Sequence, residues 1–88
     1  MQTTVTHARN PLAGWDISVS AKAGDKETIT GARILVNGFS QYDEIFDAPL
    51  NQWTQQLLQQ GDFPEENEVL VEITNGNDDV IRTQDSWK

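Results

Sequence analysis

The sequence of 88 residues contains no cysteine, which excludes disulfide bonds and thiolate metal sites. This absence leaves the redox compartment open, because a cysteine-free chain is compatible with any of them. Long apolar runs are also missing: the longest is Ile34-Leu35-Val36, far too short to cross a bilayer. Residues 1–14 lack a basic start followed by an apolar segment, so no signal peptide is predicted. We therefore expect either a cytoplasmic protein or a module of a longer exported chain, placed outside the cell or at its surface.

Positive charge is scarce and unevenly placed. The formal net charge is −8, and no lysine or arginine occurs between Arg33 and Arg82. A surface so acidic repels nucleic acid and anionic lipid headgroups, so we expect a protein partner, no nucleic acid and no membrane insertion. The acidic residues either keep a small domain soluble or form a docking face for a cation or a basic protein, with Glu65 and Glu66 as predicted contact residues. The ten carboxylates of this stretch are Asp43, Glu44, Asp47, Asp62, Glu65, Glu66, Glu68, Glu72, Asp78 and Asp79.

Side chains that commonly perform catalysis are few. His7 is the single histidine, so a Ser-His-Asp triad would have to form around this one residue of a polar terminal segment. The sequence has no glycine-rich phosphate loop, dinucleotide-binding fingerprint or zinc-ligand spacing. Neighbouring carboxylates such as Asp43 and Glu44 point to opposite faces of a strand, so their adjacency does not make a catalytic pair. We therefore expect a non-enzymatic protein with no catalytic residues and no organic cofactor.

Segments of alternating apolar and polar residues occupy much of the chain and predict β-strands. Residues 15–22 alternate strictly, and residues 27–36 continue the pattern after a turn at Gly24-Asp25. A change of phase near Gly31 predicts a β-bulge at that residue. The side chains expected on the inward face of these two strands are those of Trp15, Ile17, Val19, Ala21, Ile29, Ala32, Ile34 and Val36.

Two hairpin turns are predicted from residues that tolerate positive φ angles. Asn37-Gly38 predicts a two-residue turn into a strand over residues 39–46. Residues 75–78, Asn-Gly-Asn-Asp, predict a second turn between a strand over residues 68–74 and one over residues 80–83. The inward side chains expected here are those of Val69, Val71 and Ile73.

One segment has a different period. In residues 49–60, Leu50, Trp53 and Leu57 recur at the spacing of a helix face, with glutamines between them. Pro49 suits a first helical turn, and Gly61 suits the position after a helix end. The pattern therefore predicts one short helix over residues 49–60 that covers the sheet with its apolar face.

Five to seven short strands and one helix predict a mainly β fold, an antiparallel β-sandwich over residues 14–88. Residues 1–13 are expected to form an N-terminal arm that is either flexible or paired at a sheet edge. The runs over residues 17–38 and 67–77 resemble the opening strands and the penultimate hairpin of bacterial immunoglobulin-like domains, and the resemblance extends over residues 15–87. It implies an immunoglobulin-like sandwich that serves as a spacer or presents a ligand.

Two further groups are candidate binding residues. Asn77, Asp78 and Asp79 supply oxygen atoms of the kind that calcium prefers, and the alternative is a turn made of residues that favour turns. Trp87 either contacts a partner or closes the edge of the core. Our leading hypothesis is a structural or protein-interaction module of a larger assembly, acting as a spacer or an acidic docking face. The alternatives are a carbohydrate-binding module and a virion or cell-surface assembly subunit that polymerises through sheet edges.

Overall fold

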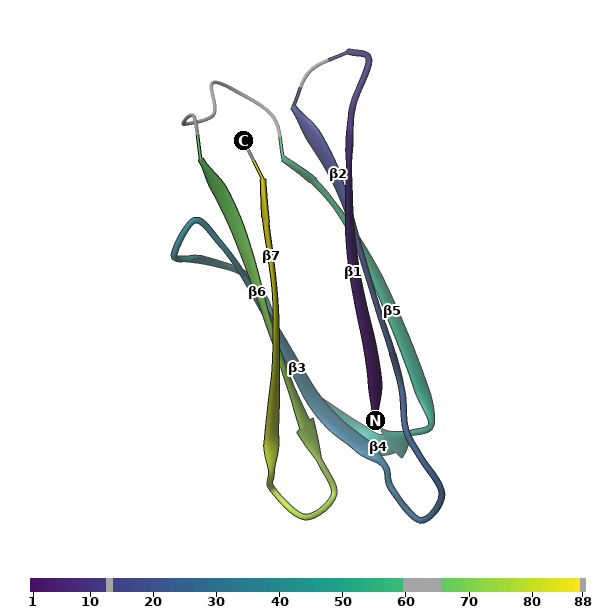
Figure 1. Ribbon diagram of the computed structural model, residues 1–88. Helices are drawn as coiled ribbons and strands as arrows, with labels where there is room; N and C mark the ends of the chain where they lie inside the picture. The colour runs from purple at the N-terminus through teal and green to yellow at the C-terminus, as the bar shows by residue number, and fades with distance from the viewer. Residues whose placement is uncertain (13, 60–65, 88) are drawn as a thin grey trace.

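A computed structural model describes residues 1–12, 14–59 and 66–87. Two antiparallel sheets pack face to face as a β-sandwich, with the three-stranded sheet in the order β1-β2-β5 and the four-stranded sheet in the order β4-β3-β6-β7 (Figure 1). The strands are β1 (Gln2–Arg9), β2 (Trp15–Lys22), β3 (Ile29–Val36), β4 (Phe39–Leu50), β5 (Gln52–Gln59), β6 (Asn67–Asn75) and β7 (Val80–Trp87). The predicted mainly β sandwich is thereby confirmed.

The core lies between the two sheets and follows from the alternation along β2, β3 and β6. Each of these strands turns every second side chain inward, so apolar residues from both sheets meet without charged neighbours. Complete burial of one such side chain stabilises the fold by about 1.5–3 kcal/mol. Trp15 is half-buried, and the other predicted inward residues are all buried: Ile17, Val19, Ala21, Ile29, Ala32, Ile34, Val36, Val69, Val71 and Ile73.

A bulge is present in β3, one residue before the predicted position at Gly31. The register shifts between Ile29 and Gly31, so the unpaired residue is Thr30. The Thr30 hydroxyl donates to the backbone carbonyls of Thr74 and Asn75, at 3.3 and 3.0 Å. A Cβ atom on Gly31 would lie 3.3 Å from the carbonyl oxygen of Glu44, which is tight and favours glycine here.

The Asn37-Gly38 turn is confirmed as a two-residue hairpin. Val36 pairs with Phe39, and both turn residues have positive φ angles, 50° for Asn37 and 84° for Gly38. The Asn37 side-chain oxygen accepts a hydrogen bond from the Glu68 backbone N–H at 2.8 Å, which ties the turn to the start of β6.

The predicted helix over residues 49–60 is wrong. β4 continues to Leu50, and β5 follows as a strand that pairs with β2 along its length. Trp53 and Leu57 are four residues apart, a spacing that places them on one side of a helix and also on one side of a strand. Pairing with β2 decides between the two, because it buries Trp53 opposite Ala21. The expected helix end at Gly61 lies outside the described residues.

The alternation of apolar and polar residues in the sequence did not predict two further features, the pairing of β1 and the place of Pro49. β1 pairs with β2 along its whole length, from Gln2 opposite Lys22 to Arg9 opposite Trp15, and forms an edge of the three-stranded sheet. Pro49 lies in the edge strand β4, a position where proline is tolerated. Within the described ranges there is no helix long and apolar enough to span a membrane.

The loop between β2 and β3 is tied to the β6–β7 turn through Glu27. Its carboxylate accepts hydrogen bonds from the Gly24 backbone N–H at 3.1 Å and from the Asn75 side chain at 3.3 Å. The Met1 ammonium group lies 2.9 Å from the same carboxylate. The Gly24 N–H, then the Met1 ammonium and Asn75, hold the pKa of Glu27 below its ordinary value of 4.5.

This lowered pKa makes part of the stability acid-sensitive. A carboxylate that is more acidic in the folded chain stabilises the fold above pH 4.5, and that contribution is lost as the pH falls through the folded pKa. We expect Glu27→Gln to lower the free energy of unfolding more at pH 7 than at pH 3, as measured by urea unfolding. An equal loss at both pH values would contradict the role given to Glu27.

Candidate interaction surface

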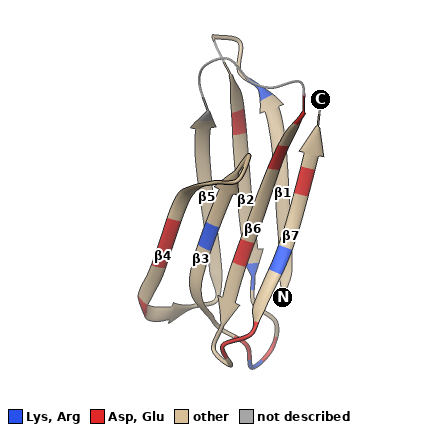
Figure 2. Cartoon of the chain, turned by 90° about the vertical axis from the view of Figure 1, so that its left-hand side faces the viewer, with Lys and Arg blue, Asp and Glu red and all other residues tan. Residues whose placement is uncertain are grey.

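The charge of the chain is concentrated on one of the two sheets. We call residues 29–50 and 66–87, the four-stranded sheet with its turns, the acidic sheet; it carries nine carboxylates and two arginines, a formal net charge of −7. Residues 1–28 and 51–59, here the neutral sheet, carry three carboxylates and three basic residues. In Figure 2 the positions of Asp and Glu, coloured red, lie along β4, β6 and β7 and in the turn between β6 and β7. The nine carboxylates are Asp43, Glu44, Asp47, Glu66, Glu68, Glu72, Asp78, Asp79 and Asp85.

The two arginines of the acidic sheet converge on one carboxylate. Arg33 of β3 and Arg82 of β7 flank Glu72 of β6, with nitrogen–oxygen distances of 3.7 and 3.0 Å. The Glu72 side chain is 17% exposed, so its charge is the one that most needs a partner. Both arginines of the acidic sheet therefore lie against Glu72.

A shallow hollow on the outer face of the acidic sheet is lined by three of these carboxylates, Asp43, Glu44 and Glu72, and by Arg33. Its volume is about 280 Å³, and Gly31, which has no side chain, is one of its lining residues. Ile45 and Val80, which are 85% and 41% exposed, border the hollow together with Asp43 and Glu44. The hollow therefore combines apolar surface with three carboxylates and one arginine, a net negative charge that suits the aliphatic stem and charged end of a further lysine or arginine.

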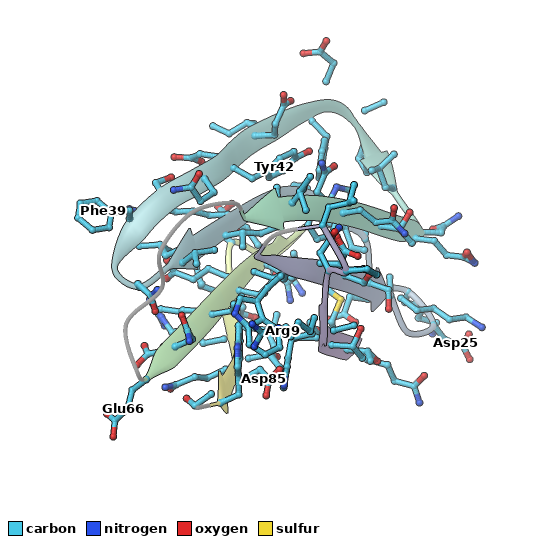
Figure 3. All side chains as sticks on the ribbon, turned by 90° about the horizontal axis from the view of Figure 1, so that it is seen from above. Arg9, Asp25, Phe39, Tyr42, Glu66 and Asp85 are labelled. Atoms are coloured by element: carbon cyan, nitrogen blue, oxygen red, sulfur yellow. The ribbon has the colours of Figure 1, made fainter. Side chains whose placement is uncertain are left out.

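Two of the predicted partner-binding residues lie together. Glu66 and Trp87 border one hollow of about 640 Å³ beside the Asn37-Gly38 turn. Glu66 is exposed and points away from the sandwich, as does Phe39 of the same turn region (Figure 3). Trp87 is only 9% exposed, so most of its ring is packed inside. The third predicted residue, Glu65, lies outside the described residues.

Trp87 belongs to a cluster that joins β1 to β7 across the two sheets. The ring of His7 stacks on Trp87, with centroids 4.1 Å apart and planes 9° apart, and Trp15 meets both rings edge-on. His7 Nδ1 lies 2.6 Å from a carboxylate oxygen of Asp85. The Arg9 guanidinium lies 5.9 Å from the Trp15 ring centroid, within cation–π range. This cluster holds the edges of the two sheets together.

The predicted calcium residues form the turn between β6 and β7. Asp78 has a φ angle of 63°, and its backbone N–H donates to the Asn75 carbonyl. The buried Asn75 side-chain oxygen accepts from the backbone N–H groups of Asn77 and Asp79, at 2.9 and 3.0 Å, so this oxygen is used by the turn itself. In the described part of the chain, no three carboxylate or histidine groups converge on a common point for a metal. Calcium binding at Asn77, Asp78 and Asp79 stays a prediction.

The aromatic side chains bear on the carbohydrate alternative. Sugar-binding surfaces present exposed rings, but Trp53 and Trp87 are 7% and 9% exposed, and Trp15 is half-buried. Phe39 is 72% exposed and stands in a turn region. Among residues 1–12, 14–59 and 66–87, no exposed aromatic pair on one flat face supports that alternative.

The resemblance to bacterial immunoglobulin-like domains stays a prediction. No protein-family model, curated protein or solved structure gives a significant match to the sequence or the fold.

Proposed function

We propose that this chain is a non-enzymatic interaction module whose acidic sheet docks a basic segment of a protein partner. The observation that carries the proposal is the separation of charge, with −7 on one sheet and zero on the other. A purely solubilising role would be served by carboxylates on both sheets, because solubility does not depend on where the charge lies. The proposal includes that the sandwich is of the immunoglobulin-like type and serves as a spacer or presents a ligand.

The acidic sheet has two properties that a docking face needs, a field of one sign and an apolar contact area. A field of one sign steers an oppositely charged partner toward the face and raises the association rate. The hollow bordered by Ile45 and Val80 then offers apolar contact to the stem of a basic side chain. Asp43 at its rim is placed to meet the charged end.

The proposal predicts that binding of a lysine-rich peptide weakens when the acidic face is reversed in charge. Asp43→Lys and Glu68→Lys remove exposed carboxylates from two different strands of the acidic sheet. Each reversal should weaken binding about fivefold to thirtyfold, since it replaces a modest attraction by a repulsion. Isothermal titration at low ionic strength with an oligolysine peptide measures this effect.

Asp16→Lys is the matched control. It changes the net charge by the same amount, but Asp16 is exposed on β2 in the middle of the neutral sheet. Its binding constant should change much less than that of the two acidic-face variants. Equal weakening by all three variants would show that the peptide responds to total charge alone, and affinity that does not fall with rising salt would likewise contradict the proposal.

A further inference from the structure

β5 is an open edge of the three-stranded sheet. It pairs with β2 on one side, and along the described ranges no strand pairs with its other side. Its sequence, Gln-Trp-Thr-Gln-Gln-Leu-Leu-Gln, contains no charged residue, proline or glycine. Open edges usually carry such residues, because unpaired backbone groups otherwise recruit another strand.

The other sheet edges of this chain do carry protective features. β4 has Asp43, Glu44, Asp47 and Pro49 along its length. β1 and β7 face each other across the sandwich and are joined by the contact of His7 with Asp85. The absence of protection in β5 is therefore specific to this strand among the edges β1, β4, β5 and β7.

The hydrogen-bonding direction along β5 follows from its pairing with β2. The Ala23 backbone N–H donates to the Asn51 carbonyl at 2.9 Å, and this pair continues the register in which Trp53 lies opposite Ala21. Hydrogen-bonded and non-hydrogen-bonded pairs alternate in an antiparallel ladder. Trp53, Gln55 and Leu57 therefore direct their backbone groups toward β2. The residues that direct their backbone N–H and C=O groups to the open side are Gln52, Thr54, Gln56 and Leu58.

We infer that two copies of this chain associate through antiparallel pairing of their β5 strands, about a twofold axis at Gln55. In this register Thr54 lies opposite Gln56 of the second copy, and Gln52 lies opposite Leu58 of the second copy. Every outward backbone group then lies opposite a strand partner, which gives about eight hydrogen bonds. For the Gln56 carbonyl, the strand partner replaces the Gln55 side-chain amide that donates to it at 3.3 Å. The exposed Leu58, at 49%, would lie against the aliphatic part of Gln52 from the second copy.

A second copy fits this edge better than a basic partner does. The strand is uncharged and lies in the neutral sheet, so it offers nothing to attract a cation. Its side chains match themselves under a twofold rotation, with Gln55 facing Gln55, as a symmetric interface requires. The total charge of −8 on each copy opposes association at low salt, so dimerisation should become tighter as salt rises. Salt should therefore strengthen dimerisation, whereas it should weaken the binding of a basic peptide.

The test is sedimentation equilibrium of the full chain at low and high ionic strength. We expect a monomer–dimer equilibrium that shifts toward dimer in high salt. Gln56→Pro should weaken dimerisation at least about tenfold, because it removes an outward donor and places a ring on the open edge. The fold should survive, since the Gln56 N–H points away from β2. An unchanged circular dichroism spectrum checks this point.

A second pair of variants distinguishes an effect of charge at the β5 edge from an effect of the total charge of the chain. Gln55→Lys places two like charges opposite each other at the axis and should also abolish the dimer, although it lowers the net negative charge. Thr4→Lys adds the same charge on β1, in the same row of the sheet as Ser20 and Thr54, and should leave the dimer intact. The inference is overturned by a wild-type chain that stays monomeric to about 1 mM in high salt. It is also overturned by a dimer that Gln56→Pro leaves unchanged, or by growth beyond the dimer.

Discussion

Replacing Trp53 with alanine is expected to lower the free energy of unfolding by about 3–5 kcal/mol, the usual range for a large core aromatic. Trp53 is 7% exposed and lies where β4 leaves one sheet and β5 enters the other. Its ring packs against Tyr42 and Phe46 of β4, with centroid distances of 5.4 and 6.5 Å. Its indole N–H donates to the Tyr42 hydroxyl at 3.4 Å. Truncation therefore leaves a cavity and removes the contact that joins the two sheets on this side.

Urea unfolding at neutral pH measures the loss, and Phe39→Ala provides the control. Phe39 is also aromatic but is 72% exposed, so its truncation should change the free energy of unfolding by less than about 0.5 kcal/mol. A loss below 1 kcal/mol for Trp53→Ala would show that Trp53 does not pack in the core as the structure has it.

Trp87→Ala is expected to have an effect of similar size, about 3–5 kcal/mol, on the opposite side of the sandwich. Trp87 is 9% exposed, stacks on His7 and lies 5.5 Å from the Trp15 ring centroid. Aromatic pairs of this geometry contribute about 0.5–1.5 kcal/mol each beyond the burial of their area. Loss of the ring would also leave His7, which contacts Asp85, without the ring on which it stacks.

Trp87→Phe and His7→Ala test this explanation by thermal and urea unfolding. Phenylalanine keeps an aromatic ring against His7, so Trp87→Phe should lose less stability than Trp87→Ala. In the His7→Ala background, Trp87→Ala should cost less than in the wild type, because the stack is already gone. Independent, additive losses for the two residues would contradict a shared cluster.

The strands with a buried face could be predicted from the sequence because their alternation is local. β2, β3 and β6 each turn one apolar face inward, and even the bulge in β3 appeared as a change of phase near Gly31. β5 could not be assigned correctly, because Trp53 and Leu57 satisfy a helix and a strand equally well. Only its pairing with β2, whose residues lie at least 30 positions before their partners in β5, distinguishes the two.

The candidate site was predictable in part. The long stretch without a basic residue was visible in the sequence, but its placement on one sheet depends on the strand order. The contact of His7 with Asp85 joins residues 78 positions apart, so no local pattern indicates it. A signal for β1 was nevertheless present, since Thr3, Val5 and His7 alternate with exposed residues along this strand.

The most direct test of the acidic docking face is an amide chemical-shift titration of the labelled chain with an oligolysine peptide. The account predicts perturbed amides on the outer side of the acidic sheet, around Asp43, Glu68 and Arg82, that recover when salt is added. The amides of Thr4 and Ser20, on β1 and β2 of the neutral sheet, should remain unchanged. Perturbations centred on the neutral sheet, or spread evenly over both sheets, would contradict the account.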